Sequence, residues 1–214
     1  MKLKSQLIAA VASIAAMIAA GGLPAHAADV VAEWANAKAP PAPALKPVTV
    51  DPKTTALLLM DFIPKDPYCG PAKPRCGASL PSMKKLLVAA RAAGATVIYS
   101  VAGNYGPADF APELAPAAND PVIKAHADKF LDTDLEKILK DKGIKTVIPT
   151  GTSGNGAVLY TASEAAMRGF TVIVPVDGLP SSDLYAEQLT VWQLAHGPGF
   201  AKQVTLTRSD MIKF

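Results

Sequence analysis

Apolar residues in this chain form short unbroken runs, separated by longer segments with a helical repeat. An unbroken apolar run of about five to seven residues is typical of a strand buried on both faces of a parallel sheet. Such runs predict strands at residues 55–61, 95–101, 122–123, 145–150, 171–176 and 201–206. Apolar positions three and four residues apart predict helices at residues 79–93, 133–142, 158–168 and 184–195.

The alternation of strands with helices indicates βαβ units. We therefore predict an α/β fold of three α-β-α layers, with a Rossmann-like parallel sheet of about six strands, an ordinary sheet size. Ligands of such sheets bind at the carboxyl ends of the strands. The positions that reach this edge are Asp61, residues 100–105, Lys124, residues 151–157 and Asp177.

The N-terminal residues differ from the rest in composition. A lysine-containing start, an apolar run at residues 7–20 and the small-x-small ending Ala25-His26-Ala27 predict a secretory signal peptide over residues 1–27. The apolar run is shorter than the roughly 20 residues of a membrane-spanning helix. Residues 28–52 are rich in alanine and proline and predict an extended arm, leaving residues 53–214 as one domain.

Charge and the leader together limit the partners of the mature chain. The formal net charge of +3 is too small to favour nucleic acid or an anionic membrane as a partner. A cleaved signal peptide leaves a protein without a membrane anchor that is periplasmic or secreted. The partner that we expect is a small-molecule ligand.

The only two cysteines, Cys69 and Cys76, lie close together in a stretch rich in proline and glycine. Two nearby cysteines in an oxidising compartment normally pair, so we predict a disulfide. A metal site would need more ligands, and no histidine lies nearby. Neither cysteine is then a candidate for a free catalytic thiolate.

Three segments in order resemble the isochorismatase-like cysteine hydrolases. The run that ends in Asp61 resembles the first strand of that family, which ends in the catalytic aspartate. Lys124, followed six residues later by Phe130, resembles the segment that carries the catalytic lysine. The stretch from Gly143 to Asp177 resembles the block that carries the nucleophilic cysteine. The resemblance covers residue 54 to the C-terminus.

The nucleophile position of that block is Ala157, six residues after Gly151 and four before Thr161. A methyl group cannot form a thioester, so the amide-cleaving cycle of the family is not expected here. The isochorismatases proper, which cleave a vinyl ether, carry a small residue in place of the cysteine and rely on the aspartate. The resemblance therefore implies a catalytic group of Asp61 and Lys124 with an inert Ala157.

The resemblance also indicates where a substrate would bind and what else the protein needs. The candidate substrate-binding residues are Tyr105, Asn155, Gly156 and Val158, with N–H groups at the start of a helix favouring an anion. The resemblance further implies a cis peptide, which we place at the Asn155–Gly156 bond. The metal-binding histidines of nicotinamidases have no counterpart, so we expect neither metal nor cofactor. Members of the family commonly assemble as dimers or tetramers, which implies a homo-oligomer.

Two other chemistries remain open at the same edge. Ser100, Thr152 and Ser153 are possible replacement nucleophiles, but a base such as His126 or His196 would have to approach in space. The glycine loop 151–156 and an acid about 20 residues later resemble a dinucleotide site, but the glycine order differs from Gly-x-Gly-x-x-Gly. The leading hypothesis is a hydrolase of a small metabolite with an Asp/Lys site; the alternative is a periplasmic pseudoenzyme that binds a small molecule.

Overall fold

The computed structural model describes residues 29–214, so the predicted signal peptide lies outside the described residues. The chain divides into two units, residues 1–41 and residues 42–214. In the described part of the first unit, the carboxylate of Asp29 accepts hydrogen bonds from the N–H groups of Val31 and Ala32, both at 2.8 Å. A single 3-10 turn, η1 (Trp34–Asn36), follows, and the chain then runs on without regular structure to Pro41.

The second unit is built on a six-stranded sheet in the order β4-β3-β2-β5-β6-β7. All neighbouring strands are parallel, as predicted. The strands are β2 (Thr55–Met60), β3 (Thr96–Val101), β4 (Val122–Lys124), β5 (Thr146–Gly151), β6 (Thr171–Pro175) and β7 (Val204–Thr207). The predicted runs therefore form the strands, with ends that differ by at most three residues.

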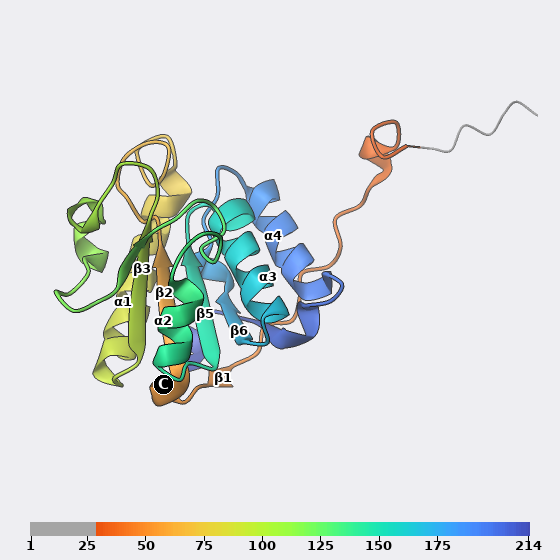
Figure 1. Ribbon diagram of the computed structural model, residues 1–214. Coiled ribbons are helices and arrows are strands. Elements are labelled where there is room, and N and C mark those ends of the chain that lie inside the picture. Colours follow the sequence, from red (N-terminus) through yellow and green to blue (C-terminus); the bar gives the residue numbers. More distant parts are fainter. Residues whose placement is uncertain (1–28) are drawn as a thin grey trace, which may run out of the picture. The chain divides into compact units, whose positions relative to one another are not determined.

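Helices cover both faces of this sheet, which confirms the three-layer α/β class (Figure 1). One helix, α1, covers one face, and three helices cover the other. Their bounds are α1 (Pro74–Ala92), α2 (Leu135–Asp141), α3 (Leu159–Met167) and α4 (Leu184–His196). The first helix begins at Pro74 rather than at the predicted residue 79, because proline fits the first turn of a helix, where its missing N–H costs no bond.

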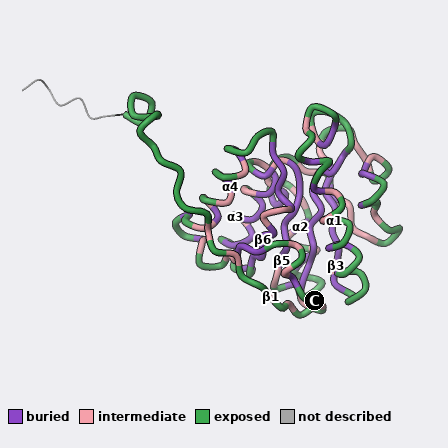
Figure 2. Tube along the Cα trace, turned by 180° about the vertical axis from the view of Figure 1, so that it is seen from behind, coloured by how far each residue is buried: buried purple, intermediate pink, exposed green. Residues whose placement is uncertain are grey.

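The central strand β2 explains why the core has two halves. Every residue of β2 is buried, because the strand lies between β3 and β5 and under helices on both sides (Figure 2). Side chains of a strand alternate between its faces. Accordingly Ala56, Leu58 and Met60 pack with α2, α3 and α4, whereas Leu57 and Leu59 pack with α1.

A short second sheet brings part of the predicted arm into the folded unit. Strand β1 (Val48–Thr49) pairs in parallel with β8 (Ile212–Lys213). The Lys46 N–H donates to the Leu206 carbonyl at 3.1 Å, and Leu45 packs against the core on the face covered by α2, α3 and α4. The compact unit therefore begins at Ala42, before the boundary that we expected at residue 53.

Candidate functional site

The carboxylate of Asp61 stands at the carboxyl end of the central strand. Its backbone has a φ of 57°, a left-handed conformation that aspartate adopts more readily than most residues. The Asp61 N–H donates to the Ser100 carbonyl at 3.0 Å, which ties the residue to the end of β3. The Ser100 hydroxyl lies 3.5 Å from Oδ1.

Lys129 is the partner of this carboxylate. Its Nζ lies 2.6 Å from Asp61 Oδ2, and the two side chains are 1% and 4% exposed. The same Nζ donates to the His126 carbonyl at 2.6 Å, while the Lys129 N–H donates to the Thr161 hydroxyl on α3 at 3.1 Å. Lys129 is thus held at both ends, by the loop after β4 and by α3.

Burial dominates the electrostatics of the pair. Removal from water raises the pKa of the Asp61 carboxyl above its ordinary value, and the Lys129 ammonium and the Ser100 hydroxyl offset only part of the increase. A carboxyl group with a raised pKa retains its proton at a higher pH and can serve as an acid.

The prediction that Lys124 accompanies Asp61 is wrong. Lys124 ends β4, an edge strand, and its side chain is exposed. Because strand side chains alternate, the burial of Ile123 directs Lys124 to the other side. The lysine is instead supplied five residues later, by the loop that leads to α2. The spacing to Phe130 pointed to Lys124, and no signal in the sequence singled out Lys129.

The glycine loop after β5 brings Ala157 to the same edge. Gly151 and Gly154 have no room for a side chain: a Cβ would lie 2.3 Å from the Met60 carbonyl oxygen and 2.4 Å from the Leu179 carbonyl oxygen. A π-helical turn, residues 154–158, then leads into α3. The non-proline cis peptide lies at Thr152–Ser153, so its predicted position at Asn155–Gly156 is wrong.

These elements enclose a cavity of about 390 Å³. This volume falls within the roughly 300–1,000 Å³ of small-molecule sites. Its lining residues are Asp61, Pro67, Tyr68, Lys73, Ala102, Gly103, His126, Ala127, Thr152, Ser153, Gly156 and Ala157. The structure therefore brings together three of the predicted residues, Asp61, Gly156 and Ala157.

The other predicted binding residues lie outside this lining. Val158 is fully buried and its N–H donates to the Ser153 carbonyl at 3.3 Å, so it offers nothing to a ligand. Asn155 is exposed, and its N–H lies 3.4 Å from the hydroxyl of Ser181. Tyr105 packs edge-on against Tyr68, a lining residue, with ring centroids 5.5 Å apart.

The predicted disulfide between Cys69 and Cys76 is confirmed, with a Cα–Cα distance of 5.2 Å. It closes the loop that carries Lys73, and Tyr68 directly precedes it. The Cys69 N–H donates to the Ile63 carbonyl at 2.8 Å, which fixes the loop beside the end of β2. Burial, followed by the charge of Asp61, raises the pKa of the Tyr68 hydroxyl, so this hydroxyl stays neutral.

A serine or threonine nucleophile gains little support. Thr152, Ser153 and His126 all line the cavity, as the sequence allowed. Within residues 29–214, however, no hydrogen bond joins either hydroxyl to the histidine ring. An activated hydroxyl needs such a base.

Among residues 29–214, no group of three or more histidine, cysteine or acidic side chains could hold a metal ion. In the same range, no helix is long and apolar enough to cross a membrane.

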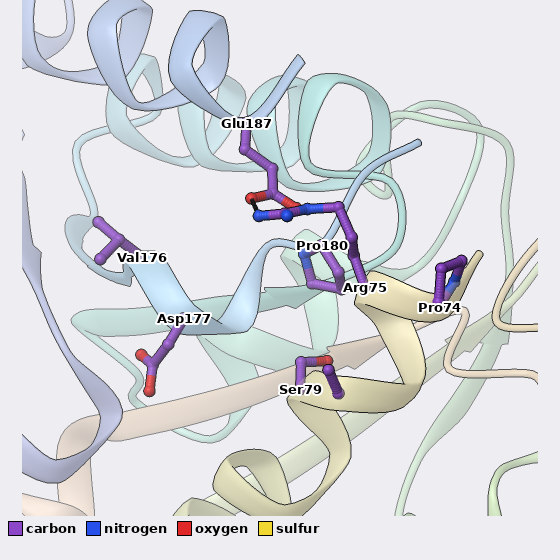
Figure 3. A pocket seen from close by; sticks show the side chains of 8 residues that line it. Pro74, Arg75, Ser79, Val176, Asp177, Pro180 and Glu187 are labelled. Atoms are coloured by element: carbon purple, nitrogen blue, oxygen red, sulfur yellow. Dashed lines mark hydrogen bonds and ion pairs between the residues drawn. The ribbon is translucent and has the colours of Figure 1, made fainter. Parts of the chain in front are cut away.

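A separate cavity of about 470 Å³ lies beside the start of α1 (Figure 3). Arg75 reaches across it to the carboxylate of Glu187 on α4, with its Nε 2.6 Å from Oε1. Asp177, the acid of the dinucleotide hypothesis, points away from this pair and accepts the N–H and hydroxyl of Ser209 at 2.8 and 2.6 Å. Asp177 does not line the cavity of Asp61, so the dinucleotide hypothesis loses its acid.

Comparison with known proteins gives a family match and several relatives. Residues 55–208 match the family model described as the isochorismatase domain. A secreted isochorismatase effector of Verticillium dahliae is 34% identical over 118 residues, which are 50% of this chain and 62% of that protein. The streptothricin hydrolase of Streptomyces noursei is 31% identical over 159 residues, 69% of this chain and 60% of that protein. The chain thus spans about three fifths of these two curated relatives.

Solved structures share the fold. An isochorismatase-like hydrolase from Alkaliphilus metalliredigens superposes with a TM-score of 0.65 at 22% identity, covering 73% of this chain and 95% of that one. The N-carbamoylsarcosine amidase of Thermoplasma acidophilum superposes with a TM-score of 0.62 at 24% identity, covering 73% and 97%. At these identities the likeness shows the fold alone.

Proposed function

Because the chain belongs to the isochorismatase family, we propose that it hydrolyses a small organic acid derivative by acid catalysis from Asp61, without a cysteine nucleophile. The hydrolases among its relatives support the reaction class. The observation that carries the proposal is the buried Asp61–Lys129 pair: the Asp61 carboxyl group lines the cavity and has a raised pKa.

Vinyl ether hydrolysis suits this arrangement best. Asp61 gives its proton to the terminal carbon of the double bond, and the ether oxygen stabilises the cation that forms. Water then adds to that cation, and the resulting hemiketal breaks into a ketone and an alcohol. The water returns a proton to Asp61, so one water is consumed for each bond cleaved.

Lys129 has a positioning role in this mechanism. Its Nζ holds Oδ2 of Asp61 at 2.6 Å and is itself held by the His126 carbonyl. The carboxyl group therefore points into the cavity in one orientation, which is the condition for efficient proton transfer. Its positive charge also stabilises the carboxylate that remains after the proton has left.

Ala157 distinguishes this site from one that forms a thioester. Its methyl group lies in the cavity wall, on the turn that leads into α3. We propose that this is the family's nucleophile position and that the small side chain leaves room for the substrate. Amide hydrolysis through a covalent intermediate is then not an activity of this chain.

We also propose that the protein works outside the cytoplasm. The signal peptide predicted at residues 1–27 and the Cys69–Cys76 disulfide support export, because disulfides persist in oxidising compartments. One curated relative is described as secreted.

The test is turnover of 2-methoxyacrylate, a carboxylate with a vinyl ether, into pyruvate and methanol. Activity should rise as the pH falls through the pKa of Asp61, because the protonated carboxyl is the acid. Asp61→Asn should abolish turnover while the protein still binds the probe. Asp177→Asn is the matched control, since that carboxylate lies outside the cavity. Saturable binding without turnover by the unaltered protein would refute catalysis and favour the pseudoenzyme.

A further inference from the structure

The charges around the cavity do not cancel. Asp61 and Lys129 neutralise one another. Lys73 also lines the cavity, and its Nζ donates only to the Ser182 hydroxyl at 3.3 Å, without an acidic partner among residues 29–214. Lys73 is therefore a positive charge in the cavity lining that no described carboxylate pairs with, and a ligand with a negative group would balance it.

Tyr68 adds a neutral donor to the lining of the same cavity. In the described part of the chain its hydroxyl makes no hydrogen bond, although the residue is partly buried and lines the cavity. Its ring cannot swing freely, because it packs edge-on at 89° against Tyr105. The Lys65 ammonium lies 5.5 Å from the centre of the Tyr105 ring and covers that ring in turn.

Lys73 lies within the loop that the disulfide closes, and Tyr68 directly precedes that loop. Between Cys69 and Cys76 the chain makes a tight turn in which the Lys73 N–H donates to the Gly70 carbonyl at 2.9 Å. A Cβ at Gly70 would lie 2.4 Å from the Asp66 nitrogen, so the turn is closely packed. No strand of either sheet pairs with this segment. The disulfide therefore restricts its conformations and keeps both donors at the cavity.

We propose that residues 67–73 form a recognition cap that binds the carboxylate of a small organic acid through Lys73 and Tyr68, and that the Cys69–Cys76 bridge holds the cap in its binding conformation. A carboxylate accepts several hydrogen bonds and pairs with ammonium groups. Bound by these two side chains, it leaves the rest of the molecule in the cavity, towards Asp61. This assignment of substrate class rests on the function proposed above.

The experiment compares 2-methoxyacrylate with its methyl ester, which keeps the vinyl ether and lacks the charge. We expect the unaltered protein to prefer the acid. Lys73→Gln should raise the KM for the acid about 10- to 100-fold, the range for losing a hydrogen bond to a charged group, with little change in kcat. Lys73→Arg should restore most of the affinity. Tyr68→Phe should cause a smaller increase in KM.

Two controls separate the cap from general effects. Lys124→Gln removes an exposed lysine outside the cavity and should leave the KM unchanged. Cys69→Ala/Cys76→Ala should weaken binding of the acid more than binding of the ester. The proposal would be overturned if Lys73→Gln weakened binding of the acid and of the ester equally, or if Lys124→Gln weakened binding of the acid as much as Lys73→Gln does. Unaltered binding of the acid by the double cysteine variant would also overturn it.

Binding is measured by NMR titration as well as by turnover, so that the two proposals can fail separately. If the protein prefers the acid to the ester but releases no pyruvate, the cap stands and the catalytic proposal falls. If it cleaves both probes equally well and binds them equally, catalysis stands and the cap is refuted.

Discussion

Replacing Lys129 with methionine tests the buried pair most directly. The two charged groups are 2.6 Å apart and their side chains are almost completely buried. Removing one member of such a pair leaves an unpaired buried charge and costs about 3–5 kcal/mol. For a domain of this size we expect a fall in the melting temperature of about 6–20 °C. Methionine retains most of the volume, so the loss of the charge dominates over a cavity.

The destabilisation should depend on pH. Without Lys129 the pKa of Asp61 rises further, because the ammonium is the main group that lowers it. The folded state then keeps a proton that the unfolded state has released. Stability is therefore present at low pH and is lost as the pH rises through the folded-state pKa. The loss in free energy of unfolding of Lys129→Met, relative to the unaltered protein, should be larger near about pH 8 than near about pH 5.

Urea denaturation at both pH values measures this deficit. Asp61→Asn/Lys129→Met, which removes both charges, should recover most of the stability, since replacing a whole buried pair is often neutral or stabilising. A loss below about 0.5 kcal/mol in Lys129→Met, the range of ordinary surface substitutions, would refute the reasoning. A loss of equal size at both pH values would also refute it.

Three further predictions follow from the disulfide, the cavity wall and α4. Ala157→Cys should introduce a thiol that iodoacetamide labels in the folded protein and should create amide hydrolysis; labelling without new activity would contradict the assignment of the nucleophile position. Cys69→Ala/Cys76→Ala should lower the free energy of unfolding by about 2 kcal/mol for a separation of 7 residues, measured by denaturant titration; no loss would show that local hydrogen bonds suffice. The expected homo-oligomer should form through α4, whose exposed residues include Leu189 and Trp192 and carry no lysine, arginine or acid, so that a second copy meets no like charge. Leu189→Glu/Trp192→Glu should therefore give monomers in analytical ultracentrifugation, and a native chain that is already monomeric would contradict the interface.

The sheet and its helices were predictable because burial on two faces leaves a plain pattern in the sequence. The run at residues 55–61 forms β2, and the helix predicted at residues 184–195 forms α4 almost unchanged. The β1–β8 pair was not predictable. A strand of two residues has no period of its own, and contacts far apart in the sequence determine its pairing.

The site was predictable where the backbone positions the residue directly. Asp61 directly follows β2, and the short glycine loop after β5 leads to Ala157, so their place at the carboxyl edge follows from the fold. Lys129 depends on the path of a loop, and a long flexible side chain reaches Asp61 from there. The spacing to Phe130 favours Lys124, and only the tertiary structure shows that Lys129 pairs with Asp61.

The left-handed backbone of Asp61 implies a conflict between the stability of the fold and the proposed activity. Glycine takes this conformation without steric cost, whereas aspartate takes it under strain. Asp61→Gly combined with Lys129→Met would remove the strain and the buried charges together. A library selected only for heat resistance should therefore accumulate such pairs and lose the proposed activity. A selection that also requires turnover should retain Asp61 and find its gains elsewhere, for example on the helix surfaces.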